Sequence, residues 1–189
     1  MHISFVLDPL VPSGIRKVVR EVVRSLQGIF EEVTFSSEVD ERLLQKQPQG
    51  ILHSNKIFGQ KHISGRHRYT VYLVSGKLFS RKNAVCGVAL RSVGIVSLFD
   101  ISHSNYDLWS AGVWEVLLHE LGHCFGLVQK RKRATSRSKT GTLHCTNSCV
   151  MSDDALFSSL WQRNAAERRR LKKPYCSLCH EYLRQKKEM

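Results

Sequence analysis

The sequence predicts a single α/β domain, and three observations support that fold class. The chain has 189 residues, a length typical of one domain. Hydrophobic residues make up 42% of it, which is ordinary for a globular protein that buries a core. Short runs rich in β-branched and aromatic residues alternate with stretches whose apolar side chains recur at helical spacing.

The first hundred residues are expected to form several strands and one amphipathic helix. Over residues 15–30, apolar side chains recur every three or four positions, so this stripe should belong to the core of the protein. Strands are expected at residues 3–7, 33–35, 69–74, 85–90 and 93–98. We expect the last of these strands to lie along a substrate cleft, where a peptide would pair with its edge.

A second helix is predicted around His119-Glu120-Leu121-Gly122-His123, which fits the H-E-x-x-H pattern. Residues i and i+4 lie on one face of a helix, so the imidazoles of His119 and His123 can bind one metal ion. Glu120 lies near that ion without being needed as a ligand, which is the place of a general base for a zinc-bound water. The alternative is a chance occurrence of the pattern on an ordinary helix.

The ends of this helix and the segments that follow it have their own signals. Asp107 or Ser110 is expected to cap the helix, and Gly126 fits the left-handed position after its last turn. Residues 129–140 carry six Lys and Arg and no acid, so we expect an exposed, mobile loop. Residues 155–170 are predicted to form a helix with an outward basic face: Arg163, Arg168, Arg169 and Arg170.

Four of the six cysteines form two closely spaced pairs, Cys145 with Cys149 and Cys176 with Cys179. Each pair fits a turn whose thiolates converge, and two such turns make a tetrahedral zinc site. The alternatives are a redox C-x-x-C pair, haem attachment through the C-x-x-C-H pattern that begins at Cys176, and unpaired structural thiols. The N-terminal residues do not resemble a secretory signal, so we expect a cytoplasmic protein whose cysteines bind metal or stay free.

These motifs together resemble the archaemetzincin family of zinc-dependent metallopeptidases, whose signature is H-E-x-x-H-x-x-G-x-x-H-C, then C-x-M, then C-x-x-C. The matching residues are His119, Glu120, His123, Gly126, His144-Cys145, Cys149-Val150-Met151 and Cys176 with Cys179. The resemblance implies a metzincin-like single domain with a twisted mixed sheet, an active-site helix and a zinc-pinned C-terminal subdomain. Residues 1–127 would form the α/β part, and residues 128–189 the basic loop and the zinc-pinned part.

The resemblance also implies two zinc ions per chain. His119, His123 and His144 would hold a catalytic zinc, with Glu120 as the general base and Met151 in a turn beneath the metal. The two cysteine pairs would hold a structural zinc. The spacing departs from the family, because 17 residues separate Gly126 from His144 where the family has two. We expect this insertion to bulge outward and return, since each doubling of loop length costs only about 0.6 kcal/mol.

The expected function is therefore hydrolysis of peptide bonds through a zinc-activated water. The net charge of +13 fits acidic peptides, nucleic acid or anionic surfaces as partners, and it is equally explained by solubility alone. We expect a monomer. No run of about 18 apolar residues occurs, so we also expect no membrane span. The main alternative is a non-catalytic zinc protein whose basic loop and tail bind nucleic acid. A third interpretation is a zinc protein that has lost activity through the insertion. Glu120 favours the enzyme, because a binding module needs no general base between two ligands.

Overall fold

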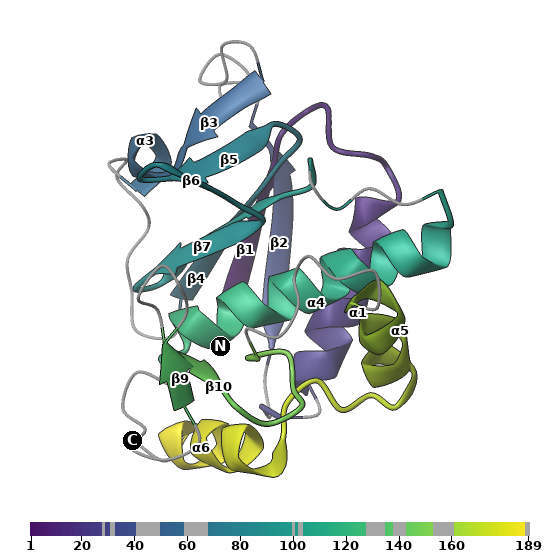
Figure 1. Cartoon of the computed structure of the whole chain (residues 1–189), viewed down its shortest axis with the longest axis vertical. Helices are drawn as coiled ribbons and strands as arrows, with labels where there is room; N and C mark the ends of the chain where they lie inside the picture. Colours follow the sequence, from purple (N-terminus) through teal and green to yellow (C-terminus); the bar gives the residue numbers. More distant parts are fainter. Residues whose placement is uncertain are drawn as a thin grey trace.

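A five-stranded mixed sheet forms the centre of the molecule, with the strand order β2-β1-β4-β8-β7 (Figure 1). It is seen in a computed structural model that describes residues 1–27, 29–30, 33–40, 50–58, 68–99, 101, 104–127, 135–137, 143–152 and 161–187. The strands are β1 (His2–Leu7), β2 (Thr34–Val39), β4 (Arg68–Val74), β7 (Gly87–Leu90) and β8 (Val93–Ser97). The first four in the spatial order are parallel, and β7 runs antiparallel to β8.

One edge of this sheet is β7, and the other is β2, which corrects the prediction that residues 93–98 line a cleft. The β8 strand lies between β4 and β7, and all five of its residues are buried. Hydrophobic patterning identified both strands, but the order of strands in the sheet is decided by tertiary pairing. Any peptide that adds to this side of the sheet therefore meets β7 first.

Two helices cover one face of the sheet: α1 (Ile15–Gln27) and α4 (Tyr106–Cys124). The predicted apolar stripe of α1 is confirmed, since six of its apolar side chains are buried in the main core. The helix stops at Gln27 rather than continuing to residue 30, although Ile29 and Phe30 still pack against that core.

A smaller layer covers part of the opposite face, and the sequence did not predict it. It consists of β3 (Ile51–His53), α3 (Ser54–Phe58), β5 (Lys77–Ser80) and β6 (Asn83–Val85), whose strands form a separate sheet. Leu52, Ile57 and Leu78 from this layer pack against side chains of the central strands to form a second core.

The C-terminal third contains α5 (Trp161–Arg170), α6 (Ser177–Lys187) and a small hairpin of β9 (Thr135–Arg137) and β10 (Leu143–Cys145). The loop prediction for residues 129–140 is therefore wrong at residues 135–137, while the rest of that segment lies outside the described residues. The predicted helix over residues 155–170 is seen from Trp161 onward, and residues 153–160 also lie outside.

The outward basic face predicted for α5 is wrong for two of its four arginines. The guanidinium of Arg168 donates to the buried carboxylate of Glu115 on α4. That of Arg169 donates to Glu21 on α1, and these two ion pairs join α5 to both helices that cover the sheet. Among the helices in the described part of the chain, none is long and apolar enough to span a bilayer.

Candidate metal centres

The helix α4 places the H-E-x-x-H segment inside the protein. It begins after Asn105, whose side chain accepts hydrogen bonds from the backbone N–H groups of residues 107 and 108, so Asn105 is the cap rather than Asp107 or Ser110. It ends at Cys124, and Gly126 follows in a left-handed conformation with φ 74°, as predicted. Every residue from Ser110 to Cys124 is buried, because α4 is enclosed by the sheet, α1 and the C-terminal elements.

Three imidazoles converge at the carboxyl end of α4, and we call them the histidine cluster: His119, His123 and His144. One ring nitrogen from each lies within 4.8 Å of the others, and all three side chains are buried. The Nε2 atoms of His119 and His123 are 3.1 Å apart. Two nitrogens bound to one tetrahedral zinc at about 2.0–2.1 Å would be about 3.3–3.4 Å apart, so the cluster fits a zinc ion.

The tautomer and charge of His119 suit a metal ligand. Its Nδ1–H donates to the carbonyl oxygen of Val150 at 2.5 Å, which leaves Nε2 with its lone pair facing the other two rings. Burial lowers the pKa of His119 to about 4, helped by the neighbouring His144 ring. Burial likewise lowers the pKa of His123 well below its usual value. Both rings are therefore neutral at physiological pH, which is the form that binds metals.

Glu120 follows His119 in the sequence, and its side chain is buried. It is not a member of the histidine cluster. A Cβ placed on Gly87 of the edge strand would lie 2.5 Å from Oε1 of Glu120, so the carboxylate packs directly against the β7 backbone. Its Oε2 atom has no hydrogen-bond partner among the described residues. Burial raises the pKa of Glu120 to about 8, and positive charge at the histidine cluster would bring this pKa back down.

His144 reaches the cluster from the β9–β10 hairpin. It lies on β10 opposite Ser136, and the next residue, Cys145, hydrogen-bonds through its N–H to the carbonyl of Met151 at 2.8 Å. The Met151 side chain is fully buried against α4, where a Cβ on Gly122 would overlap with its sulfur atom. The 17-residue separation from Gly126 therefore does not prevent His144 from joining the other two histidines.

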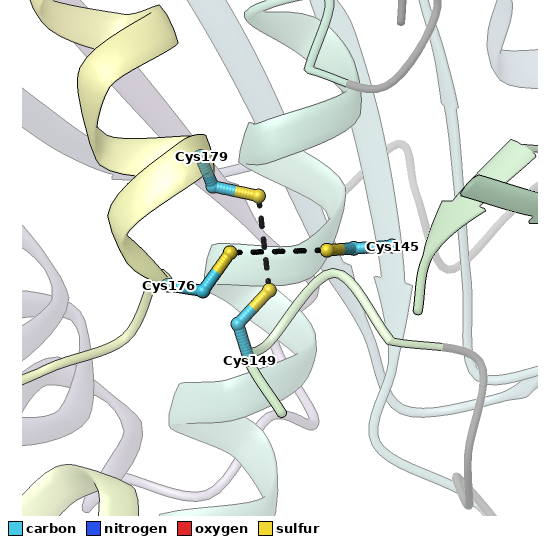
Figure 2. Close-up of side chains that lie close together, drawn as sticks. All are labelled: Cys145, Cys149, Cys176 and Cys179. Atoms are coloured by element: carbon cyan, nitrogen blue, oxygen red, sulfur yellow. Dashed lines mark hydrogen bonds between the residues drawn. The ribbon is translucent and has the colours of Figure 1, made fainter. Parts of the chain in front are cut away.

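Four thiols meet next to this hairpin, and we call them the cysteine cluster: Cys145, Cys149, Cys176 and Cys179. Figure 2 shows their sulfur atoms pointing to a common centre from the end of β10, the following turn and the start of α6. The Sγ atoms of Cys145 and Cys176 are 3.8 Å apart, and those of Cys149 and Cys179 are 3.7 Å apart. A disulfide requires about 2.05 Å, whereas four sulfurs around zinc at about 2.3 Å would be about 3.8 Å apart.

Negative charge is already favoured at one position of the cysteine cluster. Hydrogen bonds from Cys179 and from the backbone N–H groups of residues 176 and 151 lower the pKa of the Cys149 thiol. Burial raises the pKa of the Cys145 thiol. Four thiolates can coexist in this volume only around a cation, so the donor set fits a divalent metal such as zinc.

One short segment, residues 145–151, connects the two clusters. Its Val150 carbonyl accepts the hydrogen bond from His119, while the Val150 N–H donates to the carbonyl of Pro174 at 2.9 Å. Tyr175, the residue after Pro174, donates a hydrogen bond from its hydroxyl to the carbonyl of Leu118 on α4 at 2.8 Å. The cysteine cluster therefore fixes a backbone segment that touches the histidine cluster directly.

The structure brings together all seven residues that were expected to bind metal and leaves Cys86 and Cys124 outside both clusters, buried elsewhere. Three further participants were not expected from the sequence: Gly87, Gly122 and the Val150 carbonyl. Each glycine has a detectable signal, because glycine inside a strand or helix is unfavourable and often marks a close approach. The contact made by a backbone carbonyl has no sequence signal.

Comparison with known proteins identifies the fold. The crystal structure of archaemetzincin from Methanopyrus kandleri is similar to this chain with a TM-score of 0.73 and 21% sequence identity, covering 100% of this chain and 96% of that one. The archaemetzincin from Archaeoglobus fulgidus, solved in complex with malonate, has a TM-score of 0.59 at 22% identity, covering 96% and 99% of the two chains. Neither a protein-family model nor a curated protein matches. The expected α/β, metzincin-like single-domain fold is confirmed.

Proposed function

From this archaemetzincin fold, we propose that the chain is a zinc-dependent metallopeptidase. The observation that carries the proposal is the pairing of a buried three-histidine cluster with a separate buried carboxylate on the next residue of the same helix. Three protein ligands are the number that catalytic zinc sites use, because the fourth position must remain open. A purely structural site would be closed by a fourth protein ligand, as in the cysteine cluster.

The chemistry divides between the metal and Glu120. Zinc held by His119, His123 and His144 would supply Lewis acidity, lowering the pKa of a water and polarising a peptide carbonyl. Glu120 would take the proton from the attacking water at its carboxylate and deliver it to the leaving amine. Its Oε2 atom has no protein partner among the described residues, so it is available to hold that proton.

The edge strand β7 offers a way to align a peptide with this site. Among the described strands it pairs only with β8, and its first residue, Gly87, contacts the Glu120 carboxylate. A peptide that adds to β7 would run past Glu120 with its backbone held by hydrogen bonds, and acidic side chains would be favoured by the net charge of +13.

The cysteine cluster is proposed to hold a structural zinc. Four thiolates leave no open position for water, and the segment that they fix carries His144 at one end and the Val150 carbonyl near the other. Loss of this zinc would therefore disturb the histidine cluster without removing any of its ligands.

The test measures zinc content and peptide hydrolysis in the wild type and in Glu120→Ala. We expect two zinc ions in both proteins and a loss of turnover of about 10²–10⁴-fold in the variant. Equal turnover in the two would refute the role of Glu120. Zinc binding without hydrolysis, together with salt-sensitive binding of nucleic acid, would favour the non-catalytic alternative instead.

A further inference from the structure

A cavity of about 790 Å³ lies between the carboxyl end of α1 and the helix α6, and none of its lining residues belongs to either metal cluster. Its apolar lining comes from Ile29, Pro174 and Tyr175, the last two of which are buried. The volume is within the range of small-molecule sites, which is about 300–1,000 Å³. The cavity can therefore hold a ligand with an apolar body.

One face of α6 forms a polar wall of this cavity. Five of its residues line the cavity at spacings of three and four positions: Ser177, His180, Glu181, Arg184 and Gln185. The opposite stripe, with Cys179 and Leu183, is buried in the core. The helix is thus anchored through its buried inner face, and its polar face lies along the cavity.

The charged groups around the cavity are mostly positive. Lys172, Lys173 and Arg184 line it together with a single described carboxylate, Glu181, which gives a net charge of +2. The Glu181 carboxylate accepts a hydrogen bond from Gln185 at 3.2 Å. Within the described part of the chain, none of the three cations forms an ion pair, so their charges are available to a ligand.

Lys172 occupies a backbone position that favours glycine. Its φ is 53°, and the hydrogen bond from its N–H to the carbonyl of Arg169, at 3.1 Å, closes the end of α5. The residue after a helix in this left-handed conformation is usually glycine, because a side chain is strained there. The chain has a lysine instead, which puts a cation at the cavity in spite of the backbone strain.

We propose that this cavity binds a small organic phosphate. A phosphate monoester concentrates close to two negative charges on one group, which suits a cavity lined by three exposed cations and one carboxylate. Arg184 can donate two parallel hydrogen bonds to such a group, and the apolar lining can contact the organic part. An acidic peptide spreads its charges by about 3.3 Å per residue and would fit an extended groove better than a cavity of this size.

The test is calorimetric titration of the zinc-loaded full chain with phenyl phosphate, compared with inorganic phosphate. We expect saturable one-to-one binding that is tighter for phenyl phosphate, because only that ligand contacts the apolar lining. Arg184→Gln and Lys172→Gly should each raise Kd about tenfold. Glu181→Gln should lower Kd, because it removes the opposing charge.

Two controls keep the result specific. Arg20→Gln removes an exposed charge outside the cavity and should leave Kd unchanged. If Arg20→Gln and Arg184→Gln raised Kd equally, binding would depend only on the overall charge of the protein, and the proposal would be overturned. Lys172→Gly should keep or raise the unfolding temperature, since glycine fits its backbone. Absence of saturable binding, binding unaffected by Arg184→Gln, or preference for an oligoglutamate peptide would each overturn the proposal. If phenyl phosphate bound at a metal centre instead, Arg184→Gln would leave its binding unaffected, and the proposal would be overturned in that way.

Discussion

The contact between Gly87 and Glu120 gives the sharpest test of the proposed mechanism, through the substitution Gly87→Ala. The added methyl carbon would lie 2.5 Å from Oε1, 2.7 Å from Cγ and 2.8 Å from Cδ of Glu120, where ordinary contacts are 3.4–4 Å. The carboxylate must therefore move by about 1 Å, and a misplacement of that size can cost about 10²-fold in turnover. The three histidines are untouched, so zinc content should remain at the wild-type value.

Gly94→Ala is the matched control for this substitution. Gly94 lies on the neighbouring strand β8 and faces the same glutamate, but its added Cβ would be 3.6 Å from the Cβ of Glu120 and 3.6 Å from Sγ of Cys124. These are ordinary contacts, so turnover should stay within about twofold, and the loss of backbone freedom in the unfolded chain should add about 0.4–1 kcal/mol of stability.

The assay is hydrolysis of a fluorogenic peptide, with zinc measured on the same samples. Adding Glu120→Asp to Gly87→Ala shortens the crowded side chain by one methylene, so the double variant should lose less activity than the two single losses combined. Wild-type turnover in a zinc-loaded Gly87→Ala protein would refute the reasoning, because it would mean that the position of the Glu120 carboxylate does not matter for the reaction.

The remaining predictions concern the clusters and the helices around them. Replacing any member of the cysteine cluster by serine should lower zinc content and destabilise the fold, whereas serine at the two other cysteines should leave two zinc ions, as elemental analysis can determine. Gly122→Ala should cost about 1–3 kcal/mol in thermal unfolding by displacing Met151, and unchanged stability would contradict this packing. Arg168→Met should cost about 3–5 kcal/mol at neutral pH by leaving Glu115 buried without its partner. Burial raises the pKa of Glu115, so protonation of this carboxylate stabilises the folded variant. The loss of unfolding free energy in Arg168→Met should therefore shrink as pH falls. Deleting residues 129–134 should preserve both zinc ions, and loss of the histidine-bound zinc alone would show that this segment positions His144.

Six of the seven residues in the two clusters could be predicted from short spacings, whereas His144 was expected only from the resemblance to the archaemetzincins. A separation of four on a helix puts His119 and His123 on one face, and short cysteine pairs make convergent turns, whatever the rest of the fold does. The hairpin that carries His144 was missed because each of its strands has three residues, too few to show alternation. The position of β7 at the edge depends on pairing between distant segments, which local patterns do not contain. Arg168 and Arg169 were expected in solvent because a run of arginines is usually a solvated face. In the structure they bind carboxylates on other helices, Glu115 and Glu21 respectively.

The segment at residues 145–151 has a consequence for how the protein folds during its synthesis on the ribosome. Synthesis runs from the N-terminus, so the helix with His119 and His123 emerges more than fifty residues before Cys176 and Cys179. Until those thiols emerge, the segment that carries His144 and contacts His119 through Val150 has no cysteine cluster to hold it. If the chain is a peptidase, its nascent form would stay inactive until its C-terminal third has folded around zinc, and other nascent proteins nearby would be safe from it.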